Sequence, residues 1–135
     1  MKLYRVFPYD RQVEVDEMGG ALHCPRNRQG AGRHDNPDLY GAMYLSETPE
    51  GALAEQLAAF RGQALSVAML ARAGLPLALA ELDCATGEVI DLDDPATLVA
   101  EDLAPSRVAT RHRATTQARS AALYRSHARA IGVRW

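Results

Sequence analysis

The chain has 135 residues, of which 47% are hydrophobic, so it can bury one core and we expect a single domain over residues 1–135. No apolar stretch reaches bilayer-spanning length and the N-terminus lacks signal-peptide features, which predicts a cytoplasmic protein without a membrane role. The net charge of −2 is unevenly spread: residues 103–135 carry seven arginines and no acid, whereas all 17 acids precede them. This basic segment favours a phosphate-bearing cofactor or nucleic acid, or is a solvated arginine-rich helix.

The chain opens with a β-favouring run, Leu3–Phe7, which ends at Pro8 and predicts a first strand. Side chains alternate along a strand, so Arg5 is expected to point to the opposite face from its two neighbours. Residues 9–39 follow with little periodicity and many glycines, prolines and asparagines. An irregular stretch of this length is typical of a functional loop or lid.

A strand followed at once by a helix is predicted next. Ala42–Leu45 has the character of a second short strand, and Thr48 and Pro49 supply an N-cap and a first helical position. The helix is expected to continue to residue 60. Its apolar stripe is predicted to consist of three residues: Leu53, Leu57 and Phe60.

Two further strands are expected after a segment whose secondary structure the sequence pattern does not decide. Residues 63–73 are apolar over too short a stretch to separate helix from irregular chain. Leu77–Leu82 and Glu88–Leu92 have strand character. The short turn at residues 85–87 predicts that these two strands are joined directly.

Helices dominate the predicted C-terminal part. A short helix is expected over residues 96–103, after an Asp-Pro pair. The alanine- and arginine-rich stretch over residues 110–131 predicts a long helix that Gly132 ends. One face of this helix is predicted to be formed by Ala114, Ala118, Ala121 and Ala122. An extended segment, residues 133–135, is expected to begin after it.

The cysteine and histidine patterns disfavour disulfide and metal sites. Cys24 and Cys84 lie far apart and match no paired spacing, which predicts reduced thiols. The four histidines are equally scattered and do not provide the three or four ligands that a zinc site needs, so no metal is expected.

A loop, an aromatic residue and a carboxylate recur in a specific order: Gly32–Pro37, then Tyr44-Leu45-Ser46, then Glu55 eleven residues after Tyr44. With these residues, the opening Tyr4–Val6 and the closing Ala130–Trp135, the chain resembles the RES family, the toxin half of bacterial toxin–antitoxin pairs. The resemblance covers nearly the whole chain.

The resemblance implies a fold and an activity. RES proteins are similar to the ADP-ribosyltransferases, with a mixed β core and flanking helices, so an α+β fold is expected. Members cleave NAD at the nicotinamide–ribose bond and pass the product to phosphate, water or a protein. The chain is therefore expected to be a toxin-like enzyme with NAD as substrate, acting by phosphorolysis or hydrolysis; protein ADP-ribosylation is the alternative reaction.

Five site residues follow from the resemblance. Arg5 matches the family arginine that holds the cofactor's phosphate, a role suited to a planar guanidinium. Tyr44 matches the tyrosine near nicotinamide, where its ring can stack on the pyridinium. Glu55 matches the glutamate that stabilises an oxocarbenium-like ribose or orients the nucleophile. Arg33 is expected as a second phosphate contact, and Tyr40 either lines the pocket or packs under the loop.

The chain also departs from the family pattern. His34 stands where the family often has tryptophan, and His112 stands where an acid is expected. The family serine is expected after Trp135, so we expect the domain to lack its C-terminal strand or strands. Ser120 does not match that serine, because it precedes the closing segment.

Two other functions remain open from the sequence. An inactive, shortened domain could bind an antitoxin or form homo-oligomers, and the resemblance implies an Xre-type helix–turn–helix protein as the antitoxin. Direct nucleic-acid binding by the C-terminal arginines is disfavoured, because the chain lacks a recognised DNA-binding motif and interleaved aromatics.

Overall fold

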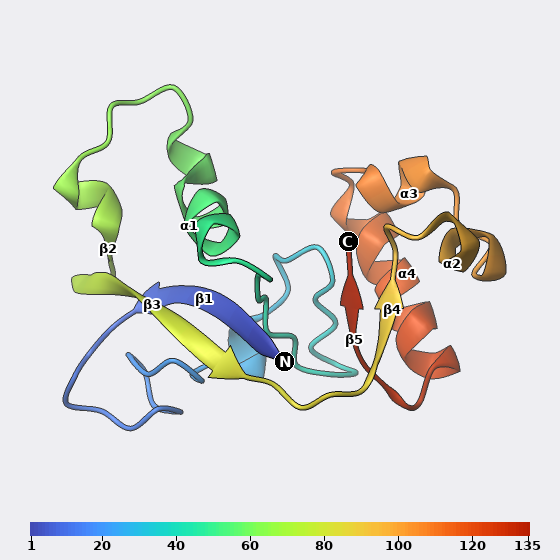
Figure 1. Cartoon of the computed structure of the whole chain (residues 1–135), viewed down its shortest axis with the longest axis horizontal. Helices are drawn as coiled ribbons and strands as arrows, with labels where there is room; N and C mark the ends of the chain where they lie inside the picture. The colour runs from blue at the N-terminus through green and yellow to red at the C-terminus, as the bar shows by residue number, and fades with distance from the viewer. The chain divides into compact units, whose positions relative to one another are not determined.

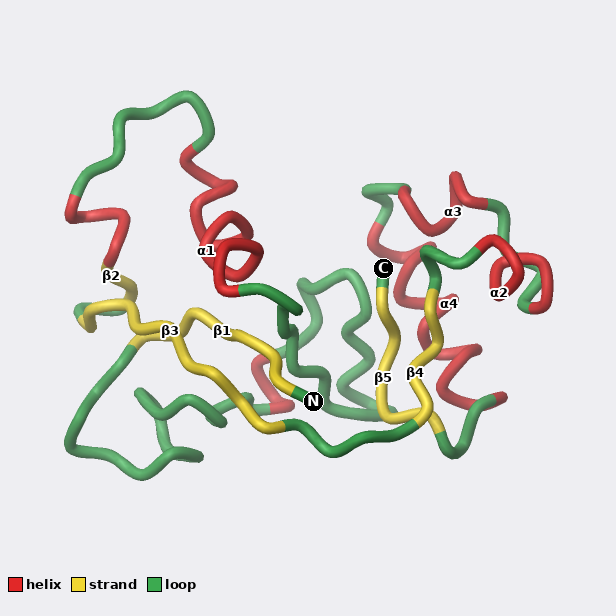
Figure 2. Tube along the Cα trace, in the orientation of Figure 1, coloured by secondary structure: helices red, strands yellow, loops and turns green.

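The structure, a computed structural model, describes residues 1–135. It is an α+β arrangement of two small sheets and four helices, which confirms the predicted class (Figures 1 and 2). The chain divides into two compact units: unit 1 comprises Met1–Cys24 and Met43–Ala85, and unit 2 comprises Pro25–Ala42 and Thr86–Trp135. None of the helices combines the length and the apolar character needed to cross a membrane.

Unit 1 is built on an antiparallel strand pair. β1 (Lys2–Pro8) pairs with β3 (Leu75–Asp83) along its whole length, and β2 (Ala71–Arg72) adds a short pairing at the other edge of β3 (Figure 1). The buried residue of β1 is Phe7, whose ring meets that of Tyr9 edge to face at 5.9 Å. The prediction of a first strand is confirmed.

Helix α1 (Pro49–Leu57) packs against β1 and β3. Its predicted start is confirmed, because the side-chain oxygen of Thr48 accepts a hydrogen bond from the N–H of Gly51 at 3.0 Å. The predicted apolar stripe is wrong at Leu53, which is 42% exposed. The buried residue of the helix is Ala52, whose small side chain suits a close approach to the sheet.

The predicted strand over Ala42–Leu45 does not form. A single antiparallel bridge instead joins Ser46 to Tyr4, through backbone hydrogen bonds of 2.8 and 2.9 Å. The helix predicted to continue to residue 60 ends as an α-helix at Leu57, and a 3₁₀ turn, Ala58–Phe60, follows it. The segment at residues 63–73, whose structure the sequence left open, contains a second 3₁₀ turn, Val67–Leu70.

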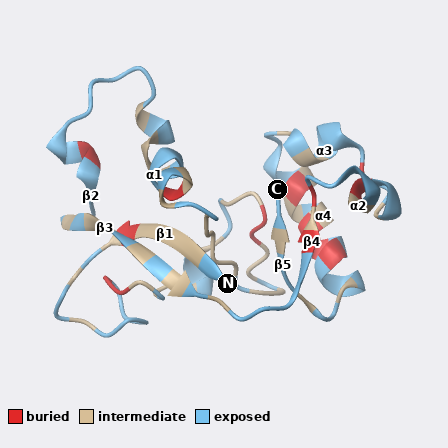
Figure 3. Ribbon diagram, in the orientation of Figure 1, coloured by how far each residue is buried: buried red, intermediate tan, exposed pale blue.

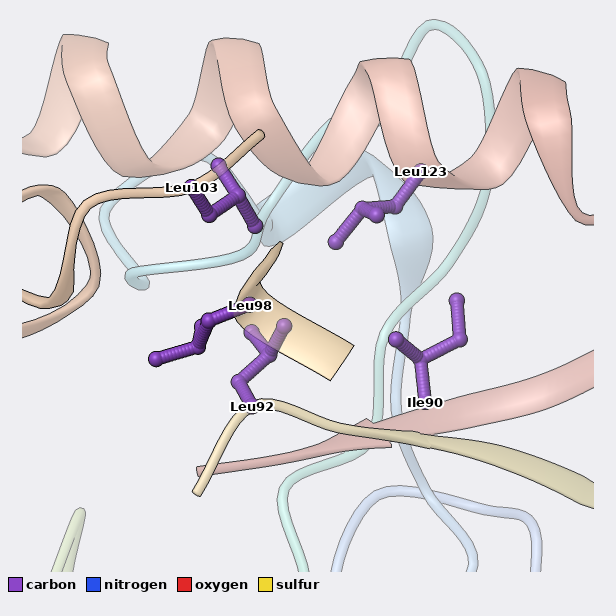
Figure 4. Packing of buried hydrophobic residues seen from close by; sticks show 5 residues of the cluster. All are labelled: Ile90, Leu92, Leu98, Leu103 and Leu123. Carbon is purple, nitrogen blue, oxygen red and sulfur yellow. The ribbon is translucent and has the colours of Figure 1, made fainter. Parts of the chain in front are cut away.

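Unit 2 combines a parallel strand pair with helices. β4 (Glu88–Asp91) pairs with β5 (Ala130–Arg134), and α2 (Pro95–Ala100), α3 (Pro105–Ala109) and α4 (Arg113–Ser126) form the crossover that parallel strands require. The core gathers between these elements, with each member 9% exposed or less (Figure 4): Ile90, Leu92, Leu98, Leu103 and Leu123.

Strand pairing and the last helix differ from the predictions. The two strands predicted at 77–82 and 88–92 form as β3 and β4 with a short connection between them, but they do not pair with each other, because β3 pairs with β1 whereas β4 pairs with β5. Helix α4 ends at Ser126 and not at residue 131, since β5 takes up Ala130–Arg134. Gly132 therefore lies in a strand and does not end the helix.

The buried face of α4 is formed mainly by polar and small residues: Thr116, Ser120, Ala121 and Leu123. The predicted alanine face is not the buried face, because Ala114, Ala118 and Ala122 are exposed and only Ala121 is buried. Ser120 can be buried because its hydroxyl donates to the carbonyl of Thr116 at 3.0 Å within the helix.

Candidate functional site

Arg5 reaches from β1 to the loop that follows this strand. Its Nη1 donates to the carbonyl of Ala21 at 2.6 Å and its Nη2 to that of His23 at 2.9 Å. Burial lowers the pKa of Arg5, nearby Cys24 opposes this and the charge of Arg72 adds to it, but a guanidinium stays protonated at neutral pH. No carboxylate forms an ion pair with it. A half-buried cation without a carboxylate partner is a candidate binding point for phosphate.

The loop that Arg5 holds is folded tightly through two glycines. Gly19 has a φ of 105°, and a Cβ there would lie 2.7 Å from the Cβ of Asp10. A Cβ on Gly20 would lie 2.3 Å from the carbonyl oxygen of Glu14. Because they have no side chain, these two glycines can pack closely against Asp10 and Glu14. They lie just before the residues whose carbonyl groups Arg5 binds.

Lys2 and Tyr4 lie on the opposite face of β1 from Arg5, in line with the predicted alternation. Both contact Glu81 of β3: Lys2 Nζ lies 2.5 Å from Oε1, and the Tyr4 hydroxyl donates to Oε2 at 3.1 Å. The hydrogen bonds from Lys2 and Tyr4 lower the pKa of Glu81. This exposed cluster joins the two strands and leaves Arg5 to the other face.

Tyr44 and Glu55 belong to the same unit as Arg5. Tyr44 is partly exposed and precedes Ser46, which pairs with Tyr4, the neighbour of Arg5. Glu55 is an exposed residue of α1, and its carboxylate makes no side-chain hydrogen bond or ion pair. The three predicted site residues therefore come from β1, from the segment bridged to β1 and from the helix packed on β1 and β3. No hydrogen bond or ion pair joins Arg5 to Glu55.

Arg33 lies in unit 2, in a glycine loop. Its Nη1 donates to the carbonyl of Val108 at 2.6 Å, at the C-terminal end of α3, where a positive charge is favoured by the helix dipole. The N–H groups of Gly30 and Gly32 both donate to Oδ2 of Asp35 at 2.8 Å. The loop's own carboxylate thus takes the place that a bound anion would take on these two amides.

Gln117 of α4 fixes the same loop from the other side. Its Nε2 donates to the carbonyls of Gly30 and Gly32, both at 2.9 Å. Sequence reasoning missed both Asp35 and Gln117 as residues that hold the loop. Asp35 has a local signal, since an acid beside glycines often bonds to nearby amides. Gln117 has none, because its partners lie more than 80 residues away in the chain.

Tyr40 also has well-defined contacts in unit 2. Its hydroxyl donates to the carbonyl of His34 at 2.6 Å and accepts from Nδ2 of Asn36 at 2.8 Å. Its ring lies 4.7 Å from that of Tyr124 on α4. Of the two roles expected for Tyr40, these contacts describe packing under the loop, and contact with NAD stays a prediction.

His34 is buried in unit 2, where it is 8% exposed. Its Nδ1 lies 2.5 Å from Oγ of Ser120, and its ring centroid lies 4.3 Å from that of Trp135. Burial, followed by the charge of Arg33, lowers the pKa of His34 from 6.5 to about 4. The side chain is therefore a neutral ring at physiological pH, which suits a position expected to hold an aromatic residue.

Acid is expected to destabilise unit 2 through His34. Its pKa is lower in the folded chain than in the unfolded chain, so the unfolded chain takes up the proton first as the pH falls. The stabilisation is complete above pH 6.5 and is lost as the pH falls to about 4, by about 3 kcal/mol in all. Urea unfolding measured across this range is expected to show the loss.

The variant His34→Phe should remove this part of the pH dependence, because it keeps a ring at the site without a titrating group. His112→Phe is the matched control, since His112 is exposed before α4. Equal pH dependence in the His34→Phe variant and the unmodified chain would show that another group is responsible.

No group of three or more histidine, cysteine, aspartate or glutamate side chains is placed to hold a metal ion.

Comparison with known proteins gives one family and no individual relative. Neither the curated proteins nor the solved structures include a detectable match, and the predicted likeness to the ADP-ribosyltransferase fold therefore stays a prediction. The family model described as the RES domain matches residues 2–135. The chain therefore belongs to the RES domain family.

Proposed function

We propose that this RES domain cleaves NAD at the bond between nicotinamide and ribose, with residues of unit 1. The observation that carries the proposal is the state of Arg5, a half-buried guanidinium fixed by two backbone carbonyls and without a carboxylate partner. Guanidinium carries five N–H donors, and these two hydrogen bonds leave donors for the oxygens of a pyrophosphate.

The chemistry assigns one task to each of the other two residues. When the bond between C1′ and the pyridinium nitrogen breaks, its electron pair neutralises the nicotinamide ring and leaves a positive charge on the ribose. The Glu55 carboxylate makes no side-chain hydrogen bond or ion pair, so it can stabilise that cation or orient the nucleophile. The Tyr44 ring can stack on the pyridinium before the bond breaks.

The nucleophile determines the product. Attack by water on C1′ gives ADP-ribose and releases a proton, whereas attack by phosphate gives the phosphorylated ADP-ribose. We propose one of these two reactions. Chromatography of the products with and without added phosphate distinguishes them, and ADP-ribose attached to protein would instead indicate transfer.

Replacing Arg5 by glutamine is expected to weaken NAD binding by about ten- to a hundredfold, because a charge-assisted hydrogen bond to phosphate is lost. Titration calorimetry measures this best in a Glu55→Gln background, where turnover is expected to be much slower. Arg5→Lys should recover part of the affinity, since it keeps the charge but not the planar fork.

Arg72→Gln is the control, because Arg72 lies near Arg5 but contacts Gln56 of α1. The control should bind NAD as the unmodified chain does. Unchanged affinity in Arg5→Gln would remove Arg5 from the site and leave the proposal without its main support.

A further inference from the structure

The loop that follows β1, residues 10–23, holds the guanidinium of Arg5 in one orientation. Nη1 of Arg5 donates to the carbonyl of Ala21 at 2.6 Å, and Nη2 donates to the carbonyl of His23 at 2.9 Å. Because both terminal nitrogens of a rigid planar group are fixed, the group does not turn freely about its bond to Nε. The two carbonyls therefore determine the orientation of the N–H donors that Arg5 has left.

Backbone hydrogen bonds close this loop on itself around the two carbonyls. The N–H of Gly20 donates to the carbonyl of Glu17 at 2.8 Å. The N–H of Leu22, which lies between the two residues that accept from Arg5, donates to the carbonyl of Val15 at 2.6 Å. The part of the loop that carries both carbonyls is thus fixed against the part that precedes it.

Gly20 lies where these two parts of the loop touch backbone to backbone. A Cβ at Gly20 would lie 2.3 Å from the carbonyl oxygen of Glu14 and 2.4 Å from that of Val15. Backbone atoms cannot turn aside as the end of a side chain can. Gly20 does not have the positive φ of its neighbour Gly19, so space alone excludes a side chain at this position.

Gly19 and Gly20 are buried, whereas the other residues of the loop are exposed or partly exposed. Figure 3 shows this short buried segment in the loop after β1. Because Gly20 directly precedes Ala21, a side chain at position 20 must displace the carbonyl of Ala21 or the part of the loop packed against it.

We propose that Gly20 is a positioning residue for phosphate binding, which acts by setting the two carbonyls that orient Arg5. This role rests on the proposed function, because there Arg5 contacts the pyrophosphate of NAD. Gly20 has no side chain that could contact the nucleotide, so it acts through Arg5 alone. Its contribution is to the binding of NAD and not to bond cleavage at the ribose.

Replacing Gly20 by alanine is expected to raise KM for NAD about tenfold, because a displaced guanidinium loses much of a charge-assisted hydrogen bond to phosphate. The kcat at saturating NAD should change less than about twofold, since only binding is affected. Nicotinamide release at a series of NAD concentrations gives both constants. An unchanged KM in the folded variant, or a loss confined to kcat, would overturn the proposal.

Nitrogen NMR of the guanidinium groups reports on Arg5 without NAD. Hydrogen bonds to both terminal nitrogens slow the rotation of the group, so the two Nη signals of Arg5 should be separate. Their absence from Arg5→Lys assigns them. In Gly20→Ala they should merge, because at least one carbonyl is displaced, and separate signals in this variant would overturn the proposal.

Gly132→Ala is the matched control, because a Cβ at Gly132 would meet no atom within 4 Å. This control should keep both the KM for NAD and the separate Arg5 signals. An equal rise of KM in Gly132→Ala and Gly20→Ala would mean that the effect does not arise at the loop, and would overturn the proposal.

His23→Ala tests the same contact if circular dichroism shows that Gly20→Ala does not fold. Nδ1 of His23 lies 3.1 Å from the carbonyl oxygen of Asp16, so removing the ring loosens the second carbonyl without adding atoms. KM should rise about threefold, as expected for one exposed hydrogen bond, and His23→Asn should restore it because its amide can donate in place of the ring. An unchanged KM in His23→Ala would overturn the proposal.

The kinetic and NMR measurements distinguish this role of Gly20 from the proposed function. If the unmodified chain neither binds nor cleaves NAD, the proposed function is wrong. The Arg5 signals then still show whether Gly20 orients Arg5: merged signals in Gly20→Ala support that orientation, and separate signals overturn it.

Discussion

Replacing Glu55 by glutamine is expected to lower nicotinamide release from NAD by about 100- to 1000-fold. Glutamine keeps the shape of the side chain but removes the negative charge that would stabilise the ribosyl cation, and losing one preorganised electrostatic contact typically has an effect of this size. The thermal midpoint should not change, because Glu55 is exposed and makes no side-chain hydrogen bond or ion pair.

Glu50→Gln provides the matched control for this experiment. Glu50 lies in the first turn of the same helix and is also exposed, so the control removes the same charge from α1. We expect it to retain most of the nicotinamide release. Comparable rates in Glu55→Gln and Glu50→Gln would exclude Glu55 from the reaction.

Replacing Leu123 by alanine is expected to destabilise unit 2 by about 2–5 kcal/mol. Leu123 is 5% exposed and packs in the cluster of Figure 4, where truncation leaves a cavity between α4 and β4. Denaturant unfolding gives the change in free energy. Hydrogen exchange should locate the loss of protection in α4, β4 and β5.

Leu53→Ala makes the same chemical change in another helix, at a side chain that is 42% exposed. Its effect on the free energy of unfolding should be much smaller, on the order of 0.5 kcal/mol. A similar loss in both variants would mean that burial does not determine the cost at Leu123.

Features that depend on neighbouring residues could be predicted from the sequence. The first strand ends where Pro8 predicts, and α1 begins at the Thr48 cap, because turn and cap preferences act within a few residues. The many glycines of residues 9–39 predict an irregular loop, as observed. The close backbone contacts that Gly19 and Gly20 allow in this loop, which Arg5 binds, could not be inferred without the structure.

Features that depend on distant pairing could not be predicted. The pattern around residues 85–87 suits a hairpin, but β3 finds its partner in β1 and β4 in β5. Alanine and arginine favour helix throughout residues 110–131, yet pairing with β4 draws Ala130–Arg134 into a strand. The positions of the alanines also did not predict which face of α4 is buried, because alanine is compatible with either a buried or an exposed face.

For the candidate site, too, the sequence predicted some features and not others. The family resemblance assigned Arg5, Tyr44 and Glu55 to one site, and all three lie in unit 1. The sequence could not show that Arg5 binds two carbonyls, nor that Arg33 donates to the end of α3. Both facts arise from tertiary contacts that leave no local pattern.

The most direct test is to incubate the chain with NAD labelled in its nicotinamide ring and to measure free nicotinamide over time. We predict release in proportion to protein concentration, together with its loss in Arg5→Gln and Glu55→Gln. Folded protein that releases no nicotinamide, with or without added phosphate, would contradict the proposed activity.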